Sequence, residues 1–205
     1  ENINPKRNVQ ECEEKVLEVK NWSAYDPNIG REILKDISFF VKKSEIVGIS
    51  GLMGAGRTEL AHSLFGNPDE YRVNGELFII GQKMHFKSPR DAINAGMAYV
   101  TEDRKGNGLI LISDIKRNIT IADLKALSKN GMLNENEEVM TANYYKDSLD
   151  IKAPSIEQKL ENLSGGNQQK VSLGKWMYVK PKVLILDEPT RGIDVGAKYE
   201  IYSIM

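Results

Sequence analysis

The first half of the chain alternates between short apolar runs and glycine or polar residues, a pattern typical of β-strands. Apolar side chains occupy every second position of 37–41, and glycines enclose the apolar run 77–80, so both segments are predicted strands. The segment 46–50 is almost wholly apolar and is predicted to be a buried strand. It leads into a glycine-rich turn and a helical pattern over 58–65.

The second half of the chain is dominated by helical patterns. A short helix is expected at 88–96, where serine and proline open it and a glycine closes it, followed by an apolar strand at 97–101. Helices separated by polar loops are predicted at 115–127, 137–149 and 167–177. The run 183–186 is wholly apolar, as expected of a central parallel strand. Together these elements predict an α/β nucleotide-binding fold.

Composition narrows the classes of function. The chain has 205 residues, 28 basic and 29 acidic side chains and 40% hydrophobic residues, which is ordinary for a folded globular protein. Its net charge of −1 leaves no electrostatic footprint for general nucleic-acid binding. The single cysteine, Cys12, excludes an internal disulfide and suits a reducing compartment. Since no apolar run has the length of a membrane span, we expect contact with a membrane only through another protein.

Both ends of the chain indicate a longer polypeptide. Residues 1–15 are polar and charge-rich, and they are expected to be a linker from an upstream domain. Residues 197–205 are compatible with a helix and lack the glycine or proline expected at a helix end. We therefore expect one domain over 16–205, truncated at its C terminus.

The segment 51–58 has the spacing of a phosphate-binding loop, except that Arg57 replaces the usual lysine. Glycines let backbone N–H groups converge on phosphates, and the following helix adds its positive N-terminal end. Thr58 can offer its hydroxyl to Mg²⁺, whereas the planar guanidinium of Arg57 does not replace a compact ammonium group. By itself, this imperfect motif is equally compatible with a tight turn that binds no ligand.

Two further segments carry matching chemistry. The run 183–186 ends in Asp187 and Glu188 and has the form of a Walker B strand, in which Asp187 would bind a metal through water and Glu188 would polarise the attacking water. Before it, the segment 163–170 places a serine and two glycines at a helix start, which makes a second anion-binding surface. A lone serine–glycine turn would be a common helix cap, but the ordered set of motifs favours a nucleotide site.

The segment 163–170 resembles the LSGGQ signature of ATP-binding-cassette (ABC) ATPases, in the variant LSGGNQQK. The resemblance covers 16–205 and implies a P-loop NTPase of the ABC type, with an N-terminal antiparallel β part and an α-helical insert at about 103–165. More narrowly, the segments 51–60, 101–105, 163–170 and 187–198 resemble the second ATPase domain of tandem proteins that power ribose-, galactose- and xylose-type sugar importers. In that subfamily arginine replaces the loop lysine in the second domain, so Arg57 supports the resemblance.

The resemblance also implies roles for single residues. In this family two domains close head to tail, and each signature covers the phosphate loop of the other. The signature residues acting in trans would be Ser164, Gly165, Gly166 and Gln168, with Asp194 in the D-loop at the interface. Glu188 would be catalytic, and the metal ligands would be Thr58, Asp187 and Glu102, the last in place of the family's Q-loop glutamine. Nucleotide would be bound by Gly51, Leu52, Met53, Gly54, Ala55, Gly56, Arg57, Thr58 and Tyr25.

Tyr25 is the candidate for the aromatic residue that stacks on adenine, and Trp22 is the alternative; either could instead belong to the core. The switch histidine of the family would follow Met205. Because that histidine and the loop lysine are both missing, we expect the isolated fragment to hydrolyse ATP weakly or not at all.

The implied function is an ATP hydrolase, with ATP and Mg²⁺ as cofactors, that energises import of a monosaccharide. Its expected partners are a second ABC ATPase domain fused upstream, transmembrane permease subunits and, indirectly, an extracytoplasmic sugar-binding protein, with no nucleic acid. Its expected place is peripheral, on the cytoplasmic face of the membrane. The alternatives are a non-transport ABC ATPase acting on DNA or ribosomes, and a nucleotide-binding regulatory module without turnover.

Overall fold

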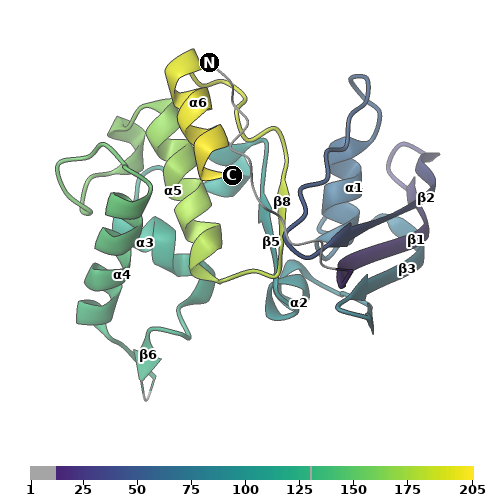
Figure 1. Ribbon diagram of the computed structural model, residues 1–205, viewed down its shortest axis with the longest axis horizontal. Helices are drawn as coiled ribbons and strands as arrows, with labels where there is room; N and C mark the ends of the chain where they lie inside the picture. Colours follow the sequence, from purple (N-terminus) through teal and green to yellow (C-terminus); the bar gives the residue numbers. More distant parts are fainter. Residues whose placement is uncertain (1–12, 130) are drawn as a thin grey trace. The chain divides into compact units, whose positions relative to one another are not determined.

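The computed structural model describes residues 13–129 and 131–205 (Figure 1). Cys12 and most of the expected linker 1–15 lie outside the described residues. The chain divides into two compact units, residues 1–91 and 92–205. The phosphate-loop motif belongs to the first unit, and the signature and the acidic strand end belong to the second.

An antiparallel sheet forms the first unit, in the order β2 (Arg31–Lys42), β1 (Lys15–Asp26), β3 (Arg72–Ile79), β4 (Gln82–Met84). This confirms the predicted N-terminal antiparallel part and the strands at 37–41 and 77–80. On β1, Val19 and Ala24 are buried whereas Lys20 and Tyr25 are exposed, since successive side chains of a strand point to opposite faces. Helix α1 (Arg57–Leu64) is tied to this sheet, because the buried Nε1 of Trp22 donates a 3.0 Å hydrogen bond to Oγ of Ser63.

The prediction of a buried strand at 46–50 is wrong. The structure has no strand there, and Ile46, Val47 and Ile49 are 67%, 39% and 51% exposed. An apolar run forms a strand only where a neighbouring strand satisfies its backbone groups. No strand within 13–129 and 131–205 pairs with this segment, so its apolar composition alone is insufficient.

A parallel pair of strands, β5 (Met97–Val100) and β8 (Val183–Leu186), lies in the second unit, with Met97 opposite Val183. All four residues of β5 are buried. Both strands were predicted, and β8 has the predicted bounds. However, Leu184 is 37% exposed, so β8 is not covered on both faces as a central strand would be. Helix α2 (Pro89–Asn94) precedes β5, as the serine–proline pair predicts.

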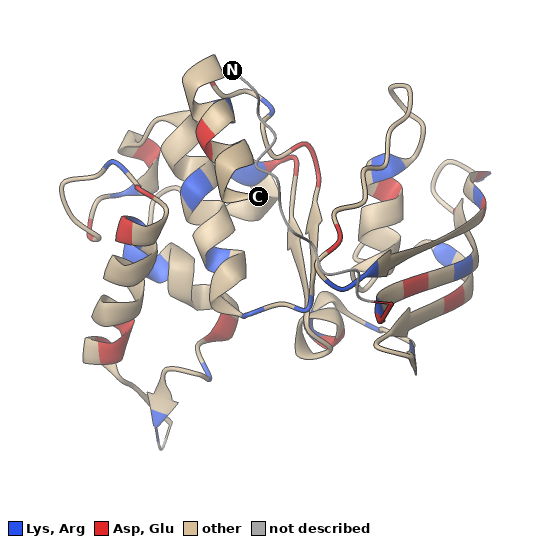
Figure 2. Ribbon diagram, in the orientation of Figure 1, with Lys and Arg blue, Asp and Glu red and all other residues tan. Residues whose placement is uncertain are grey.

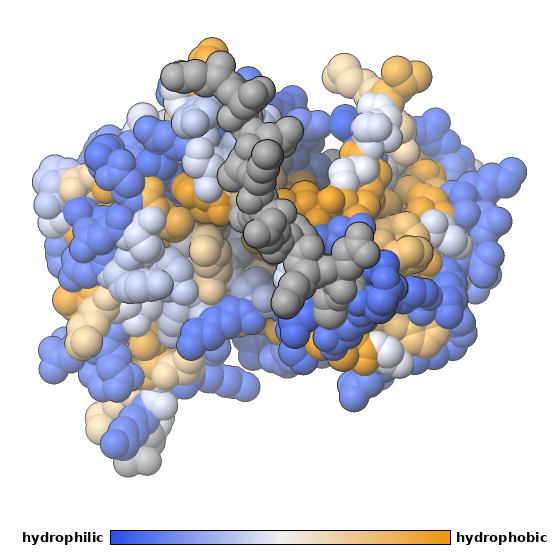
Figure 3. All heavy atoms as spheres, viewed as in Figure 1, coloured by the Kyte–Doolittle hydropathy of each residue, from blue (hydrophilic) through white to orange (hydrophobic). Residues whose placement is uncertain are grey.

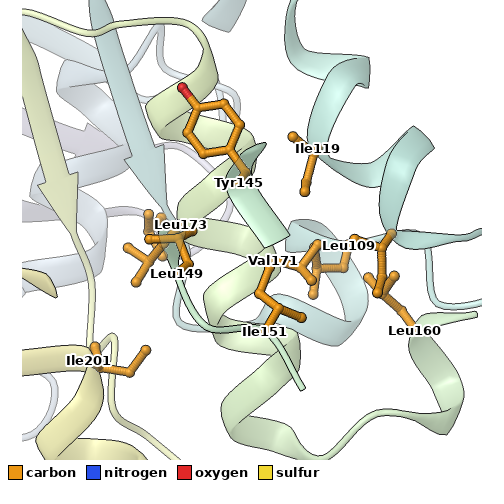
Figure 4. Packing of buried hydrophobic residues seen from close by; sticks show 11 residues of the cluster. Leu109, Ile119, Tyr145, Leu149, Ile151, Leu160, Val171, Leu173 and Ile201 are labelled. Carbon is orange, nitrogen blue, oxygen red and sulfur yellow. The ribbon is translucent and has the colours of Figure 1, made fainter. Parts of the chain in front are cut away.

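The second unit also contains the helices α3 (Ile115–Thr120), α4 (Glu135–Ser148), α5 (Gly165–Tyr178) and α6 (Val195–Ile204). Figure 4 shows their apolar side chains gathered around α5. The buried cluster consists of Val100, Leu109, Ile115, Ile119, Tyr145, Leu149, Ile151, Leu160, Val171, Leu173 and Ile201. Such a shared core fixes the relative positions of these helices.

The predicted helices 137–149 and 167–177 are confirmed as α4 and α5. The predicted helix 115–127 is too long, because α3 ends at Thr120 and the 3₁₀ turn η2 (Ile121–Asp123) follows. The hydroxyl of Thr120 donates to the carbonyl of Lys116 at 3.0 Å, and such side-chain bonds compete with the regular helical ladder. A small hairpin of β6 (Ser128–Lys129) and β7 (Met132–Leu133) then leads to α4.

The surface of both units mixes charged, polar and apolar residues, and short turns join the larger elements. Basic and acidic residues are interspersed on both units (Figure 2), and on the face seen in Figure 3 hydrophobic residues lie between hydrophilic ones. Two short helical turns complete the second unit, the π-helix η1 (Arg104–Gly108) and the 3₁₀ turn η3 (Leu160–Asn162). None of the helices in the described part of the chain is long and apolar enough to cross a bilayer.

Candidate functional site

The glycine loop 51–56 leads directly into α1. Gly54 and Gly56 have φ angles of 76° and 87°, which side chains with a Cβ adopt only with strain. A Cβ on Gly56 would also lie 2.9 Å from Cδ2 of Leu34. No side-chain hydrogen bond caps the start of α1, and a Cβ on Gly54 would meet nothing within 4 Å. An open, uncapped helix N-terminus of this kind suits a phosphate group.

Arg57 and Thr58 begin α1 and are half-buried. Leu52 and Met53, at the tip of the loop, are 85% and 96% exposed. Both residues are therefore in contact with solvent rather than with the core. The hydroxyl and the guanidinium at the helix start are therefore the polar side-chain groups that the sequence predicted beside the phosphates.

Tyr25 and Trp22 have different environments on β1. Trp22 is 7% exposed and hydrogen-bonded to Ser63, so it is a core residue. Tyr25 is 37% exposed, and the guanidinium carbon of Arg72 lies 5.9 Å from its ring centroid. Of the two candidates for stacking on adenine, only Tyr25 offers an accessible ring.

Asp187 follows β8 and is held in place by two hydrogen bonds. Its backbone N–H donates to the carbonyl of Val100 at 2.9 Å, and its Oδ2 accepts from the hydroxyl of Tyr99 at 3.0 Å. Only 8% of Asp187 is exposed. The sequence motif did not reveal Tyr99, because nothing local to 97–101 indicates that it faces a carboxylate 88 residues away.

Glu188 is exposed and has a φ angle of 45°. A non-glycine residue in the left-handed region costs roughly 1 kcal/mol or more. Its carbonyl accepts from the backbone N–H of Arg191 at 3.0 Å, which closes a turn and holds this conformation. Of these two adjacent residues, Asp187 is thus buried and Glu188 is exposed.

The signature turn, residues 163–166, opens α5. Ser164 is the N-cap, and its Oγ accepts from the backbone N–H of Asn167 at 3.4 Å and from its Nδ2 at 2.9 Å. Gln168 is buried, and its Nε2 donates to the carbonyls of Leu160 and Leu163 at 3.0 and 3.3 Å. Its side chain therefore holds the turn in shape and does not face solvent. Asn167, which the sequence argument did not select, is the half-buried residue beside Ser164.

The D-loop segment, residues 191–194, lies beside the signature turn. Asp194 caps α6, because its Oδ1 accepts from the backbone N–H of Ala197 at 2.9 Å. A Cβ built on Gly165 would lie 3.3 Å from the carbonyl oxygen of Gly192, and one on Gly166 would lie 2.5 Å from Cβ of Ala197. An alanine at 166 would therefore clash with α6, whereas an alanine at 165 would require its neighbours to shift by a few tenths of an ångström.

Glu102 is the residue that the resemblance assigns to the metal in place of the family's Q-loop glutamine. Its carboxylate forms an ion pair with Nη1 of Arg191. The two residues, together with Asp103, Arg104 and Lys105, line a polar hollow. Within residues 13–129 and 131–205, no group of three or more His, Cys, Asp or Glu side chains forms a ready-made metal site.

Residues 34–191 match the family model described as ABC transporter. Among curated proteins, the chain is 53% identical to the L-arabinose transport ATP-binding protein AraG of Geobacillus stearothermophilus, over 94% of this chain and 38% of the relative. It is 51% identical to the xylose import ATP-binding protein XylG of Thermoanaerobacter pseudethanolicus, over the same shares. It is 46% identical to the ribose import ATP-binding protein RbsA of Bacillus subtilis, over 94% of this chain and 37% of the relative. The chain thus spans somewhat over a third of these relatives.

Solved structures of similar fold are ATP-binding cassettes. The structure of cbiO1 from Clostridium perfringens, part of the ABC transporter complex cbiONQ, has a TM-score of 0.71 and 24% identity, over 92% of this chain and 71% of that one. A nucleotide-free ATP-binding cassette from an ABC transporter has a TM-score of 0.76 and 19% identity, over 93% and 75%. At these identities the likeness concerns the fold alone. It confirms the predicted α/β P-loop architecture of the ABC type.

Proposed function

The chain belongs to the ABC transporter family, and we propose that it is the second ATP-binding domain of a protein that energises monosaccharide import through a membrane permease. The observation that carries the proposal is 46–53% identity, over 94% of the chain, to proteins named for the transport or import of arabinose, xylose and ribose. These names favour sugar import over the alternative of an ABC ATPase acting on DNA or ribosomes. The chain covers 37–38% of each relative, which leaves room for another domain of similar size.

We propose that ATP is held by the loop 51–56 together with Arg57, Thr58 and Tyr25. The open glycines and the uncapped start of α1 fit a phosphate group. Mg²⁺ prefers hydroxyl and carboxylate oxygens as ligands, and the family resemblance assigns to it Thr58 of the first unit and Asp187 of the second. When bound, Mg²⁺ would neutralise charge on the phosphates. Glu102 would join this set only after leaving its ion pair with Arg191.

In this proposal Glu188 accepts a proton from the attacking water, and Asp187 stays fixed by Tyr99. Ser164 and the N-terminal amides of α5 would face the γ-phosphate of ATP held by a partner ABC domain, with Asp194 at the same interface. The domain would lie at the cytoplasmic face of the membrane and contact the permease, and an extracytoplasmic sugar-binding protein would take part indirectly.

The proposal predicts a functional asymmetry between two substitutions in the intact transporter. Ser164→Ala should abolish sugar uptake, because this signature completes the competent site on the other domain. Arg57→Ala should only attenuate uptake, because the loop of this domain holds the weaker, mainly structural nucleotide. Uptake of labelled sugar into vesicles checks both variants.

A matched control separates the two effects of Ser164→Ala, the loss of its proposed contact with nucleotide and the loss of a helix N-cap. Ser164→Ala also removes a helix N-cap, which costs about 1 kcal/mol of stability. Asn134 caps α4 in the same unit through its Oδ1, so Asn134→Ala removes a comparable cap and should leave uptake close to normal. Equal losses of uptake from Ser164→Ala and Arg57→Ala would contradict the asymmetry. Uptake that survives Ser164→Ala would contradict the role of the signature.

Calorimetry with Mg-ATP tests whether the loop of this domain is occupied. Arg57→Lys should bind at least as tightly as the natural sequence, since lysine restores the compact ammonium group. Binding only by the lysine variant would show that the native loop is degenerate. In that case the signature would be the main contribution of this domain.

A further inference from the structure

We infer that Arg104 is a positioning residue that joins the D-loop segment to the signature turn and so fixes their arrangement toward the partner domain. The inference rests on the proposed function, since it concerns the two segments that would meet the partner's nucleotide. Arg104 touches neither nucleotide nor reacting atoms in this proposal. It would act through the backbone of the D-loop segment.

The guanidinium group binds two successive carbonyls of the D-loop segment. Its Nη1 donates to the carbonyl of Arg191 at 3.0 Å, and its Nη2 donates to the carbonyl of Gly192 at 3.2 Å. A planar fork with several fixed N–H donors suits two neighbouring acceptors, whereas a lysine ammonium reaches one of them as a point charge. Arginine at this position therefore holds the backbone of the D-loop segment in a defined orientation.

The same guanidinium lies against the signature turn. A Cβ built on Gly165 would lie 3.0 Å from Nη2 of Arg104 and 3.5 Å from Cγ2 of Ile193. Nε of Arg104 is buried and has no hydrogen-bond partner within the described residues, so that side of the guanidinium is packed rather than hydrated. Burial also lowers the pKa of Arg104, although arginine stays protonated in proteins. Arg104 thus fills the space between the two segments.

The base of Arg104 is itself anchored. Asp103 caps the turn η1, because its Oδ1 accepts from the backbone N–H of Gly106 at 2.9 Å. At the other end of η1, Nζ of Lys175 on α5 donates to the carbonyl of Gly108 at 2.6 Å. The signature helix α5 therefore holds η1, and η1 in turn holds the D-loop segment through Arg104. Because Arg104 is held both at its backbone in η1 and at its guanidinium group, it restricts the D-loop segment more than a side chain held at one end would.

Arg191 has a second tether that runs to the same region. While its carbonyl accepts from Arg104, its own guanidinium pairs with the carboxylate of Glu102. Glu102 and Arg104 are two residues apart, so both contacts connect the segment after β5 with the D-loop segment. If Glu102 turns toward a bound metal, Arg104 is the contact that remains.

The test compares three variants in the intact transporter. Arg104→Ala removes both donors, and Arg104→Lys keeps the charge but not the fork. Lys105→Ala is the matched control, because Lys105 lines the same hollow and is exposed. The measurements are kcat and KM for ATP hydrolysis, and hydrogen–deuterium exchange of the peptide covering 189–196.

For Arg104→Ala we expect kcat to fall about tenfold while KM for ATP changes less than about twofold, as for a group that acts only on the assembled site. Exchange of 189–196 should become about tenfold faster, with α4 unchanged. Arg104→Lys should lie between Arg104→Ala and the natural protein, and Lys105→Ala should match the natural protein. Unchanged exchange of 189–196 in Arg104→Ala would overturn the inference, as would equal effects from Lys105→Ala.

Failure of the proposed function would give a different set of experimental results. If the natural protein shows no ATP turnover that depends on Ser164, the role in sugar import is wrong, and the exchange data alone still decide the inference on Arg104. If turnover depends on Ser164 but Arg104→Ala leaves kcat unchanged, the proposed function stands and the inference falls.

Discussion

The hydroxyl of Tyr99 donates a 3.0 Å hydrogen bond to Oδ2 of Asp187, across 88 positions of sequence. Both residues are buried, at 7% and 8% exposure, and they lie on or beside the parallel pair β5 and β8. Side-by-side parallel strands bring their ends to the same edge of a sheet. The bond therefore orients a candidate metal ligand through the pairing of two strands.

Tyr99→Phe removes this donor while preserving the ring. We expect a loss of about 1 kcal/mol in the free energy of unfolding, since a buried acceptor loses its partner. ATP hydrolysis by the intact transporter should also fall several-fold, because the carboxylate of Asp187 loses its orientation. Urea unfolding and turnover measurements check the two effects. Tyr199→Phe, which alters an exposed tyrosine of α6, serves as control and should change neither.

Ser63→Ala tests the tie between β1 and α1. The substitution leaves the buried Nε1 of Trp22 without its 3.0 Å partner, which should destabilise the first unit by about 1–3 kcal/mol. Tryptophan fluorescence during urea unfolding reports the change. Ser203→Ala removes an exposed hydroxyl from α6 and should leave stability within about 0.5 kcal/mol. Equal stabilities of the two variants would mean that the Trp22–Ser63 bond contributes nothing.

Gly166→Ala should force α5 and α6 apart. The new Cβ would lie 2.5 Å from Cβ of Ala197, far inside van der Waals contact, so we expect a loss of about 1–3 kcal/mol. Adding Ala197→Gly removes the opposing methyl group and should restore part of that stability. A double-mutant cycle by urea unfolding measures the coupling. If the two substitutions change the free energy of unfolding additively, the side chains at positions 166 and 197 are not in steric conflict.

Lys175→Met should change how stability depends on pH. Burial lowers the pKa of Lys175 from 10.5 to about 8. Between these pH values the unfolded chain keeps a proton that the folded chain has released, so the free energy of unfolding rises with pH across this window, by at most about 3 kcal/mol. Below about pH 8 Lys175 is charged in the folded protein, and the full cost of burying this charge lowers the free energy of unfolding.

Met carries no titrating proton, so Lys175→Met should lose this rise between pH 8 and 10. Unfolding in urea at a series of pH values measures it. Lys125→Met replaces an exposed lysine and should keep the pH dependence of the natural sequence. A rise that persists in Lys175→Met would assign it to other groups.

The local pattern was sufficient for the elements that depend only on local physics. Ser164 caps α5 and the apolar run 183–186 is a strand, because capping and strand formation require a few neighbouring residues. The glycine loop 51–56 leads into a helix at the predicted place, since α1 begins at Arg57. One exception is 46–50, whose apolar composition predicts a strand although the structure supplies no strand to pair with it.

The sequence by itself thus determined the order of motifs and the fold class, since these follow from short-range spacing and the period of apolar residues. Only the tertiary structure decided which groups meet. It buried Gln168 beneath the signature turn, paired Glu102 with Arg191, and placed Arg104 between two segments about 60 and 87 positions farther along the chain. The physical reason is that a hydrogen bond or ion pair requires approach to about 3 Å, and such approach between distant segments is set by how helices and strands pack around a shared core.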